Sequence, residues 1–237
     1  MRKIVIAGVA VGAALLAGCG SAADARSASG IDVSILRVVE YDYPIFDSLE
    51  HLAADQPMVA AGVVEGFDDG RTVLTWNPDL GYHDTRDRST VMKVRVDEVF
   101  KGEGYVFDGH VYVTLPRGGE MITKAGEPAR PAKAPSTVVA TGAFDNAIPK
   151  GTRIALTAVP ASTDAHPAET WVGVHDGYPE GATLMATPPQ GIILEDGGTD
   201  SALGGTVELH TELSGWQGIQ NFQDVERRLE QQFPGRR

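Results

Sequence analysis

Cysteine is almost absent from this sequence of 237 residues, which has a single one at position 19. One cysteine cannot form a disulfide within its own chain, so the fold has to be stabilised by its hydrophobic core alone. A chain of 237 residues is long enough to bury a hydrophobic core that stabilises the fold without disulfides. Aromatic residues make up 7% of the chain. No apolar run after residue 16 approaches the length of about 20 residues that spans a bilayer.

Several sequence motifs that carry chemistry are also missing. We find no G-x-S-x-G, no H-E-x-x-H, no G-x-x-x-x-G-K-[ST], no Gly-rich dinucleotide turn and no D-x-[DN]-x-[DN]-G. Their absence excludes the corresponding families, whereas a site built from distant residues remains open. The net charge of −12 argues against binding to nucleic acid, because acidic surfaces repel phosphates. The sequence predicts no cofactor.

The N-terminus holds the clearest pattern. Arg2 and Lys3 precede an uncharged apolar run over residues 4–16, the length of the hydrophobic region of a secretory signal. The run ends in Leu16-Ala17-Gly18-Cys19, which resembles the lipobox of bacterial lipoproteins. The resemblance implies cleavage before Cys19 and acylation of its thiol by a diacylglyceryl group with fatty acids such as palmitate. The alternatives are an ordinary signal peptide with a chance cysteine, or a short N-terminal transmembrane anchor.

The chain divides into three parts on this interpretation. Residues 1–18 form the signal peptide, and residues 19–30 form the acylated cysteine and a small, polar, flexible tether. Residues 31–237 form one mainly-β domain. Loss of Arg2 and Lys3 changes the net charge from −12 to −14, so we expect the lipid, rather than a basic face, to hold the protein on the extracytoplasmic side of the cell membrane.

Short strands separated by Gly and Pro turns predict the fold class, a small antiparallel OB-like barrel or sandwich. The run 58–67 ends at the turn signal 68–70, and 71–76 is its expected hairpin partner, followed by a polar loop over 77–88. Residues 89–104 alternate as a half-buried strand. Further predictions are listed together: an early strand or docking segment at 31–39, a short helix between Pro44 and Pro57, a mobile loop over 117–136, strands at 110–116, 137–143, 152–161, 170–178 and 205–213, two short apolar pieces within 181–198, and a C-terminal amphipathic helix at about 220–233.

Residues 56–161 are similar to small OB-like barrels of the netrin-like kind. The similarity is carried by "DQPMVAAGVVEGF", "TVMKVRVDEVFKGEG", "GHVYVTLPRGG" and "IPKGTRIALTAVP", an order that also occurs in exported bacterial proteins, many of them lipoproteins. The cysteines of the netrin-like family are absent here. Its inhibitory members chelate a protease metal with a free N-terminal cysteine, a role that acylation of Cys19 would remove.

Candidate site residues fall into several groups. His83-Asp84 and His175-Asp176 could contribute to a metal site, although none of the six histidines has ligand spacing to another, so solvated surface histidines are the other interpretation. Glu98 is either a buried acid or base, or a residue at a strand end where the alternation shifts. The remaining candidates are acidic turns at Asp68, Asp69 and 84–88, a basic loop at 124–133, and aromatics that form either a binding face or core: Trp76, Tyr82, Tyr105, Trp171, Tyr178 and Trp216.

Two classes of function fit these observations. The first is a membrane-anchored envelope lipoprotein, a non-enzymatic module that binds an envelope protein or a small molecule. The second is an exported hydrolase with a dispersed site, which requires a pocket where His175 or His83 lies beside a carboxylate. A metal-binding accessory protein is a third possibility. The sequence favours the non-enzymatic module, while leaving enzymatic activity open.

Overall fold

The computed structural model describes residues 30–37, 45–129 and 138–235. Within these ranges, eight strands form one sheet, joined by three α-helices and two short 3-10 helices. The strands are β1 (Met58–Asn77), β2 (Tyr82–Lys101), β3 (His110–Met121), β4 (Arg153–Pro160), β5 (Glu169–Val172), β6 (Leu184–Ala186), β7 (Ile192–Asp196) and β8 (Ser201–Gly204). The helices are η1 (Val33–Leu36), α1 (Leu49–Asp55), η2 (Glu103–Tyr105), α2 (Thr141–Ala147) and α3 (Phe222–Gln232).

Five of the strands close into a ring in the order β1-β2-β3-β6-β4, because β4 pairs back onto β1. The β3–β6 pair is parallel, and the other four pairs in the ring are antiparallel. Strand β5 extends the sheet beside β1, and β7 and β8 extend it beyond β4. The prediction of a mainly-β barrel or sandwich with a short N-terminal helix and a C-terminal helix is confirmed, although one pair of strands is parallel.

Alternating side chains fill the barrel. Met92 and Val94 of β2 point inward, while Lys93 and Arg95 point out, as the alternation over 89–104 predicts. The inward-facing residues of the barrel strands include Met58, Ala60, Val64, Val111, Val113, Leu115, Ile154, Leu156 and Met185. Val99 and Glu98 pair with Ala60 and Ala61, and bulges in this stretch shift the alternation, so that Phe100 is buried outside the barrel.

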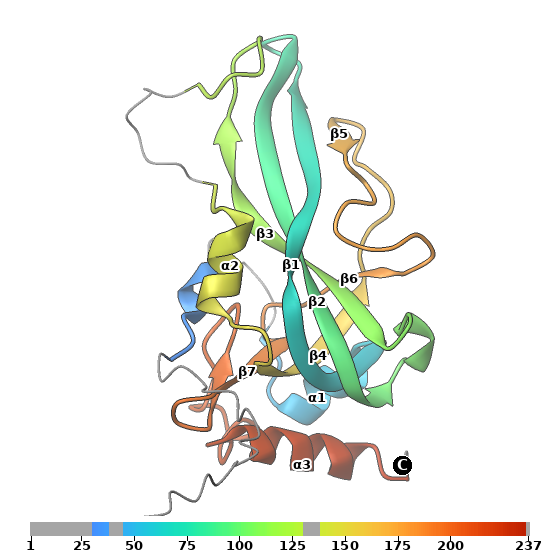
Figure 1. The fold of residues 1–237 in the computed structure, drawn as a ribbon, viewed down its shortest axis with the longest axis vertical. Helices are drawn as coiled ribbons and strands as arrows, with labels where there is room; N and C mark the ends of the chain where they lie inside the picture. The colour runs from blue at the N-terminus through green and yellow to red at the C-terminus, as the bar shows by residue number, and fades with distance from the viewer. Residues whose placement is uncertain (1–29, 38–44, 130–137, 236–237) are drawn as a thin grey trace, which may run out of the picture.

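A second hydrophobic cluster lies outside the barrel, between its strands and the helices α1 and α3. These two helices lie at one end of the barrel (Figure 1). Val59 and Ala61 of β1 face this cluster, so the run from Met58 to Ala61 is apolar on both faces of its strand. Helix α1 contributes Leu49, Leu52 and Ala53, and α3 contributes Phe222, Val225 and Leu229. Asn221 and Asp224 form a capping box that fixes where α3 begins.

Two arginines tie α3 to the rest of the molecule. Arg228 donates two hydrogen bonds of 2.6 Å to the Glu50 carboxylate of α1. Arg153 of β4 pairs with Glu195 at 3.1 Å and with Glu226 of α3. Its guanidinium carbon also lies 4.7 Å from the centre of the Phe222 ring. These contacts orient α3. Burial of its apolar side chains supplies most of the free energy that holds it against the rest of the fold.

The predicted hairpin over 58–76 is wrong. Residues 68–70 do not turn, because β1 runs unbroken to Asn77 and the hairpin turn lies at 78–81, so 82–88 belong to β2 rather than to a polar loop. The register instead shifts between Asp69 and Thr72. Hydroxyl groups of β2 bind this irregular stretch: Thr90 Oγ1 donates to the Asp68 carbonyl at 2.7 Å. Turn-forming residues therefore serve as a β-bulge here.

Four further predictions need correction. The strand predicted over 170–178 ends at Val172, because β5 covers Glu169–Val172 and a turn follows it. Residues 141–147 form α2, with Phe144 buried, in place of a strand over 137–143, and Val139 is bound to Arg117 in an extended segment before the helix. Residues 117–121 continue β3, so the loop predicted for 117–136 starts later, and 130–136 lie outside the described residues. Residues 205–213 form no strand: the chain folds back after Gly204 so closely that a Cβ there would lie 2.1 Å from the Val207 carbonyl oxygen.

The segment at 31–39 packs against the barrel core, and its described part forms no strand. Its described part, residues 31–37, holds η1, and Leu36 is buried in the barrel core. The Asp32 side chain accepts a hydrogen bond from the Ser34 amide at 3.0 Å and so begins the 3-10 turn. Residues 38 and 39 lie outside the described residues.

Substitution of Gly62 tests the close approach of strands in the ring. A Cβ at Gly62 would lie 2.1 Å from the Arg95 carbonyl oxygen, an atom of the β2 backbone that cannot move alone. We expect Gly62→Ala to lower the free energy of unfolding by about 2 kcal/mol or more, as overpacking does. Urea denaturation would measure the change.

Gly142 supplies the matched control. It lies in α2, is exposed, and a Cβ there would meet nothing within 4 Å. Gly142→Ala should raise the stability by about 0.5–1 kcal/mol, because alanine favours the helix. Equal effects of the two substitutions would contradict the role assigned to Gly62.

Candidate functional site

Four polar side chains gather on the outer face of the barrel where β1, β2 and β3 lie side by side. Glu65 of β1 lies within 3.1 Å of Lys93 Nζ and 3.1 Å of His110 Nε2, both measured to its Oε2 atom. Arg95 Nε lies 3.9 Å from the other oxygen, Oε1. We call Glu65, Lys93, Arg95 and His110 the Glu65 cluster.

Strand irregularity brings Glu65 to this position. The register of β1 against β2 shifts between Val64 and Gly66, so Glu65 is the extra residue of a bulge. Gly66 has a φ of 153°, a value that favours glycine. Cross-strand register places Arg95 opposite His110, on the same face of the sheet.

Opposite charges hold the centre of the cluster. The hydrogen bond from Lys93 lowers the pKa of the Glu65 carboxyl below its ordinary value, and His110 adds to this effect. The same bond to Glu65 raises the pKa of Lys93. The side chains of Glu65 and His110 are about four-fifths buried, at 21% and 18% exposed, whereas that of Arg95 is 49% exposed. Arg95 is therefore the most accessible charge of the cluster.

Aromatic side chains border the Glu65 cluster. Tyr112 of β3 is opposite Lys93 in the register, and its ring centre lies 6.3 Å from that of His110. The ring of Tyr178 lies 6.4 Å beyond Tyr112. The segment that carries Tyr178 packs against the sheet, because Gly177 approaches Val91 so closely that a Cβ would lie 2.8 Å from it. Tyr112 is buried beneath this segment, and Tyr178 is half-buried. The face thus combines paired charges with one partly exposed aromatic side chain, which suits binding of a polar ligand or of a partner's side chains.

The histidine pairs predicted from the sequence do not come together. His83 lies near the start of β2, beside the hairpin turn that joins it to β1. Its Nε2 atom is 3.0 Å from the Thr170 hydroxyl, and its ring packs edge-on against Trp76. His175 lies 3.2 Å from the Tyr178 hydroxyl. Among the residues that the structure describes, no three His, Cys, Asp or Glu side chains converge as metal ligands would. The sequence does not predict the pair of His110 and Glu65, because the bulge at Glu65 is not visible in the alternation.

The carboxylates singled out from the sequence do not gather at one site. Asp69 binds Arg117 and the Thr141 hydroxyl, which connects β1 to β3 and α2. Asp84 is buried and accepts a hydrogen bond of 2.6 Å from the Asn77 amide. Glu98 is half-buried beside the bulges of β2, as the shifted-alternation interpretation predicts. Asp68 is exposed.

The aromatic candidates divide between core and surface. Trp216 is buried and donates a hydrogen bond of 2.8 Å from Nε1 to the Phe46 carbonyl. Trp171 lies under the Arg71 guanidinium at 3.8 Å, and Tyr105 packs against the barrel core. Trp76 is 43% exposed. Tyr82 is half-buried, and the described part of the basic segment, residues 124–129, is mostly exposed.

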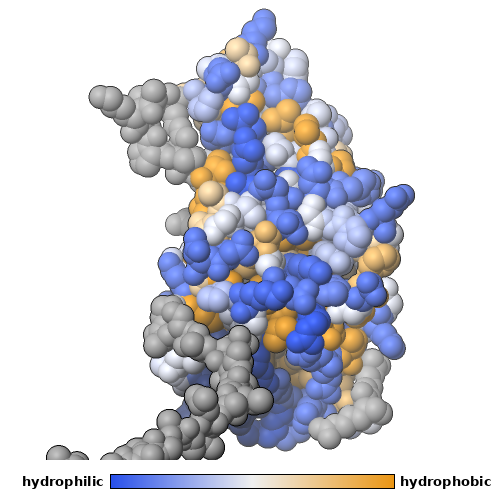
Figure 2. Space-filling model, in the orientation of Figure 1, coloured by the Kyte–Doolittle hydropathy of each residue, from blue (hydrophilic) through white to orange (hydrophobic). Residues whose placement is uncertain are grey.

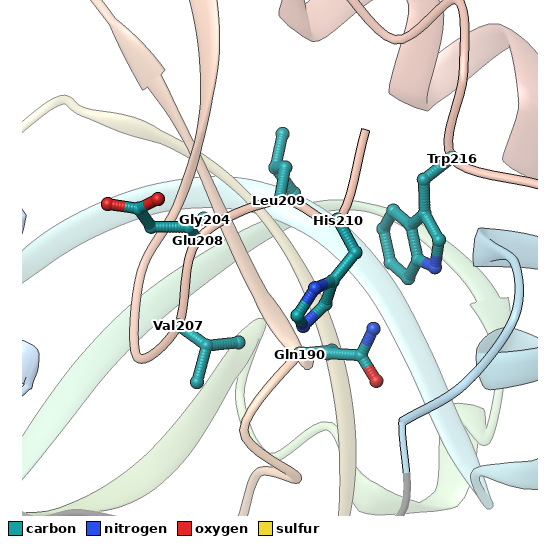
Figure 3. A pocket seen from close by; sticks show the side chains of 7 residues that line it. All are labelled: Gln190, Gly204, Val207, Glu208, Leu209, His210 and Trp216. Atoms are coloured by element: carbon teal, nitrogen blue, oxygen red, sulfur yellow. The ribbon is translucent and has the colours of Figure 1, made fainter. Parts of the chain in front are cut away.

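A small hollow lies at the other end of the molecule, between the chain after β8 and Trp216 (Figure 3). It is a shallow depression of about 160 Å³, a figure that includes open solvent, and its lining includes Gln190, His210 and Trp216. The side chain of Gln190 is occupied by the backbone of Phe46, to which it donates and from which it accepts. The hollow is smaller than the sites that bind drug-sized molecules.

The lipobox over Leu16–Cys19 lies outside the described residues. None of the helices within the described ranges is long and apolar enough to cross a bilayer. Comparison with models of known protein families gave no match, and comparison with curated proteins gave none either.

The ion pair at the centre of the Glu65 cluster gives a pH-dependent prediction. In a double-mutant cycle of Glu65→Gln and Lys93→Met, we expect a coupling energy of about 0.5 kcal/mol at pH 7, since the pair is partly exposed. The lowered pKa of Glu65 means that its contribution is present above pH 4.5 and is lost as the pH falls through the folded-state pKa. The raised pKa of Lys93 means that its contribution is present below pH 10.5 and is lost at higher pH.

Urea denaturation of the four proteins at pH 3, 7 and 9 measures this coupling. The energy should be the same at pH 7 and pH 9 and should fall at pH 3. A coupling that persists unchanged at pH 3 would show that the two side chains interact other than through charge.

Proposed function

We propose that this chain is a lipoprotein, anchored through Cys19 on the extracytoplasmic side of the cell membrane, and that its β-barrel binds an envelope protein or a small molecule without catalysing a reaction. The observation that carries the anchor is the sequence Leu16-Ala17-Gly18-Cys19 behind a short apolar run. Acylation of Cys19 with two or more fatty chains would hold the domain stably at the bilayer, whereas one chain gives marginal binding.

The Glu65 cluster supports the binding role. OB-like barrels bind ligands on the outer face of their second and third strands. In this chain that face belongs to β2 and β3, which carry Lys93, Arg95, His110 and Tyr112. The charged groups offer hydrogen bonds to a carboxylate or an amine, and the half-buried Tyr178 offers apolar surface beside them.

Intact mass and membrane fractionation test the anchor. Wild type and Cys19→Ala are expressed in a bacterial host that acylates lipoproteins. Wild type should lose residues 1–18, gain the mass of a diacylglyceryl group and partition with membranes, whereas Cys19→Ala should do none of these. An unmodified, soluble wild type would contradict the proposal and leave an exported protein with a free thiol.

Site-specific photo-crosslinking in living cells tests the binding face. A photoreactive phenylalanine analogue at Arg95, the most exposed member of the Glu65 cluster, should yield a crosslinked product that Lys93→Glu weakens. The same analogue at Gln223, which is exposed on α3, serves as the control. Equal products from both positions would show that the barrel face is not a preferred contact.

A further inference from the structure

Strands β1 and β2 reach far beyond the barrel (Figure 1). Each has 20 residues, and β4 pairs only with the first six residues of β1, from Met58 to Val63. From Asp68 to Asn77, β1 extends for about 33 Å at roughly 3.3 Å per residue. There it pairs with β2 on one side and, over Thr72–Thr75, with β5 on the other. We call this projection the arm, and we call residues 76–82 together with Met121 its tip.

Apolar side chains are exposed at the tip. Trp76, Leu80 and Met121 are 43%, 51% and 54% exposed. Val172 and Val174, on and beside β5, bring to five the number of exposed large hydrophobic residues on or next to the arm, out of eight in the described residues. On the side of the molecule drawn in Figure 2, hydrophobic residues lie exposed among hydrophilic ones over the whole face, the upper half included.

These side chains cover both faces of the sheet. Met121 is opposite Thr85, which is opposite Thr75, and all three share one face. Trp76 follows Thr75 in the strand and therefore points to the other face, where it meets His83. Leu80 lies in the turn between the strands. A protein partner that docks on one face of a sheet covers one of these side chains, whereas a medium that surrounds the tip covers them all.

The charge of the tip also fits a lipid medium. Residues 76–82 contain one charged residue, Asp79, and the neighbouring residues 122–129 add Lys124 and Glu127. Trp and Tyr are the residues enriched where the acyl chains of a bilayer meet its head groups, and the tip has Trp76 and Tyr82. Because the whole chain is acidic, we expect electrically neutral phospholipids, rather than anionic ones, to accept it.

The length of chain before the barrel allows the tip and Cys19 to reach one membrane. Residues 19–30 can extend to at most about 40 Å, close to the length of the arm. They lead into Ile31, which packs against the barrel core beside η1. At most about 40 Å of chain therefore separates the anchor from the barrel, which allows a second part of the molecule to meet the same bilayer.

We propose that the tip of the arm inserts into the interface of the bilayer that holds the lipid of Cys19, as a second membrane contact that orients the barrel. This inference rests on the proposed function, since it takes the chain to be anchored at a membrane. Trp76, Leu80, Tyr82 and Met121 enter the head-group region, and the strands behind them keep the Glu65 cluster away from the bilayer.

Tryptophan fluorescence tests the contact with the whole lipidated protein. The protein is reconstituted into phosphatidylcholine vesicles with or without bromine atoms on the acyl chains, which quench nearby tryptophans. Trp76 is one of three tryptophans, and the other two are covered by Arg71 or buried. Brominated lipid should therefore quench up to roughly one third of the emission, as expected for one interfacial tryptophan.

Two pairs of variants assign the signal. Trp76→Phe should abolish the quenching by brominated lipid, and Trp171→Phe should retain it. Leu80→Asp should reduce the quenching several-fold, because it places a charge in the tip. Ile45→Asp is its matched control, since Ile45 is also 51% exposed but precedes α1, away from the arm, and it should leave the quenching unchanged.

The outcomes separate this inference from the proposed function. An acylated, vesicle-bound protein whose Trp76 is not quenched would overturn the inference, would leave the anchor intact and would favour a protein partner for the tip. An intact mass without acylation would overturn the anchor. In the unacylated protein, the difference in quenching by brominated lipid between wild type and Trp76→Phe would then test the tip contact independently of the anchor.

Discussion

The double pairing of β1 is the constraint on which the structure depends. Its first residues hydrogen-bond to β2 on one side and to β4 on the other, and this second pairing closes the ring. A strand that is central in a closed sheet, and is covered on both faces, has to be apolar on both faces. The run Met58–Ala61 meets this requirement: Met58 and Ala60 fill the barrel, while Val59 and Ala61 hold the layer of α1 and α3. The absence of a side chain at Gly62 lets the β2 backbone pack closely against β1 on the other side.

Irregularities in β1 decide what the outer face presents. A regular strand pointing Val64 into the barrel would place Glu65 outward and Gly66 inward, whereas the bulge here keeps Phe67 inward as well as Val64. Glu65 is left as the extra residue, and it meets side chains from two neighbouring strands. The bulge thus determines both the packing of the core and the composition of the Glu65 cluster.

The periodicity of apolar residues predicts the elements of this fold that are buried on one side. It fails where contacts with distant residues determine the local structure. The alternation of Met92, Lys93 and Val94 identifies β2, and the spacing of Phe222, Val225 and Leu229 identifies α3, because each pattern records burial on one side. Residues 68–70 carry the composition of a turn, yet they lie within a strand, where hydroxyls of β2 donate to the carbonyls of Asp68 and of the following Arg71. The Glu65 cluster could not be predicted, because it joins residues 45 positions apart through a register that a single sequence does not reveal.

The layer under α1 and α3 has a consequence for the order in which the chain acquires its structure. The apolar sides of α1 and of early β1 are complete by residue 61, but their cover, α3, begins at Phe222. Because a chain is synthesised from its N-terminus, about 160 residues are added while this surface has no native partner. The β1–β2 hairpin can form meanwhile from neighbouring residues, whereas the closure of the ring waits for β4. Helix α3 is therefore the last element to cover this apolar surface. A nascent chain that ends before α3 would leave the surface exposed to chaperones that bind incompletely folded proteins.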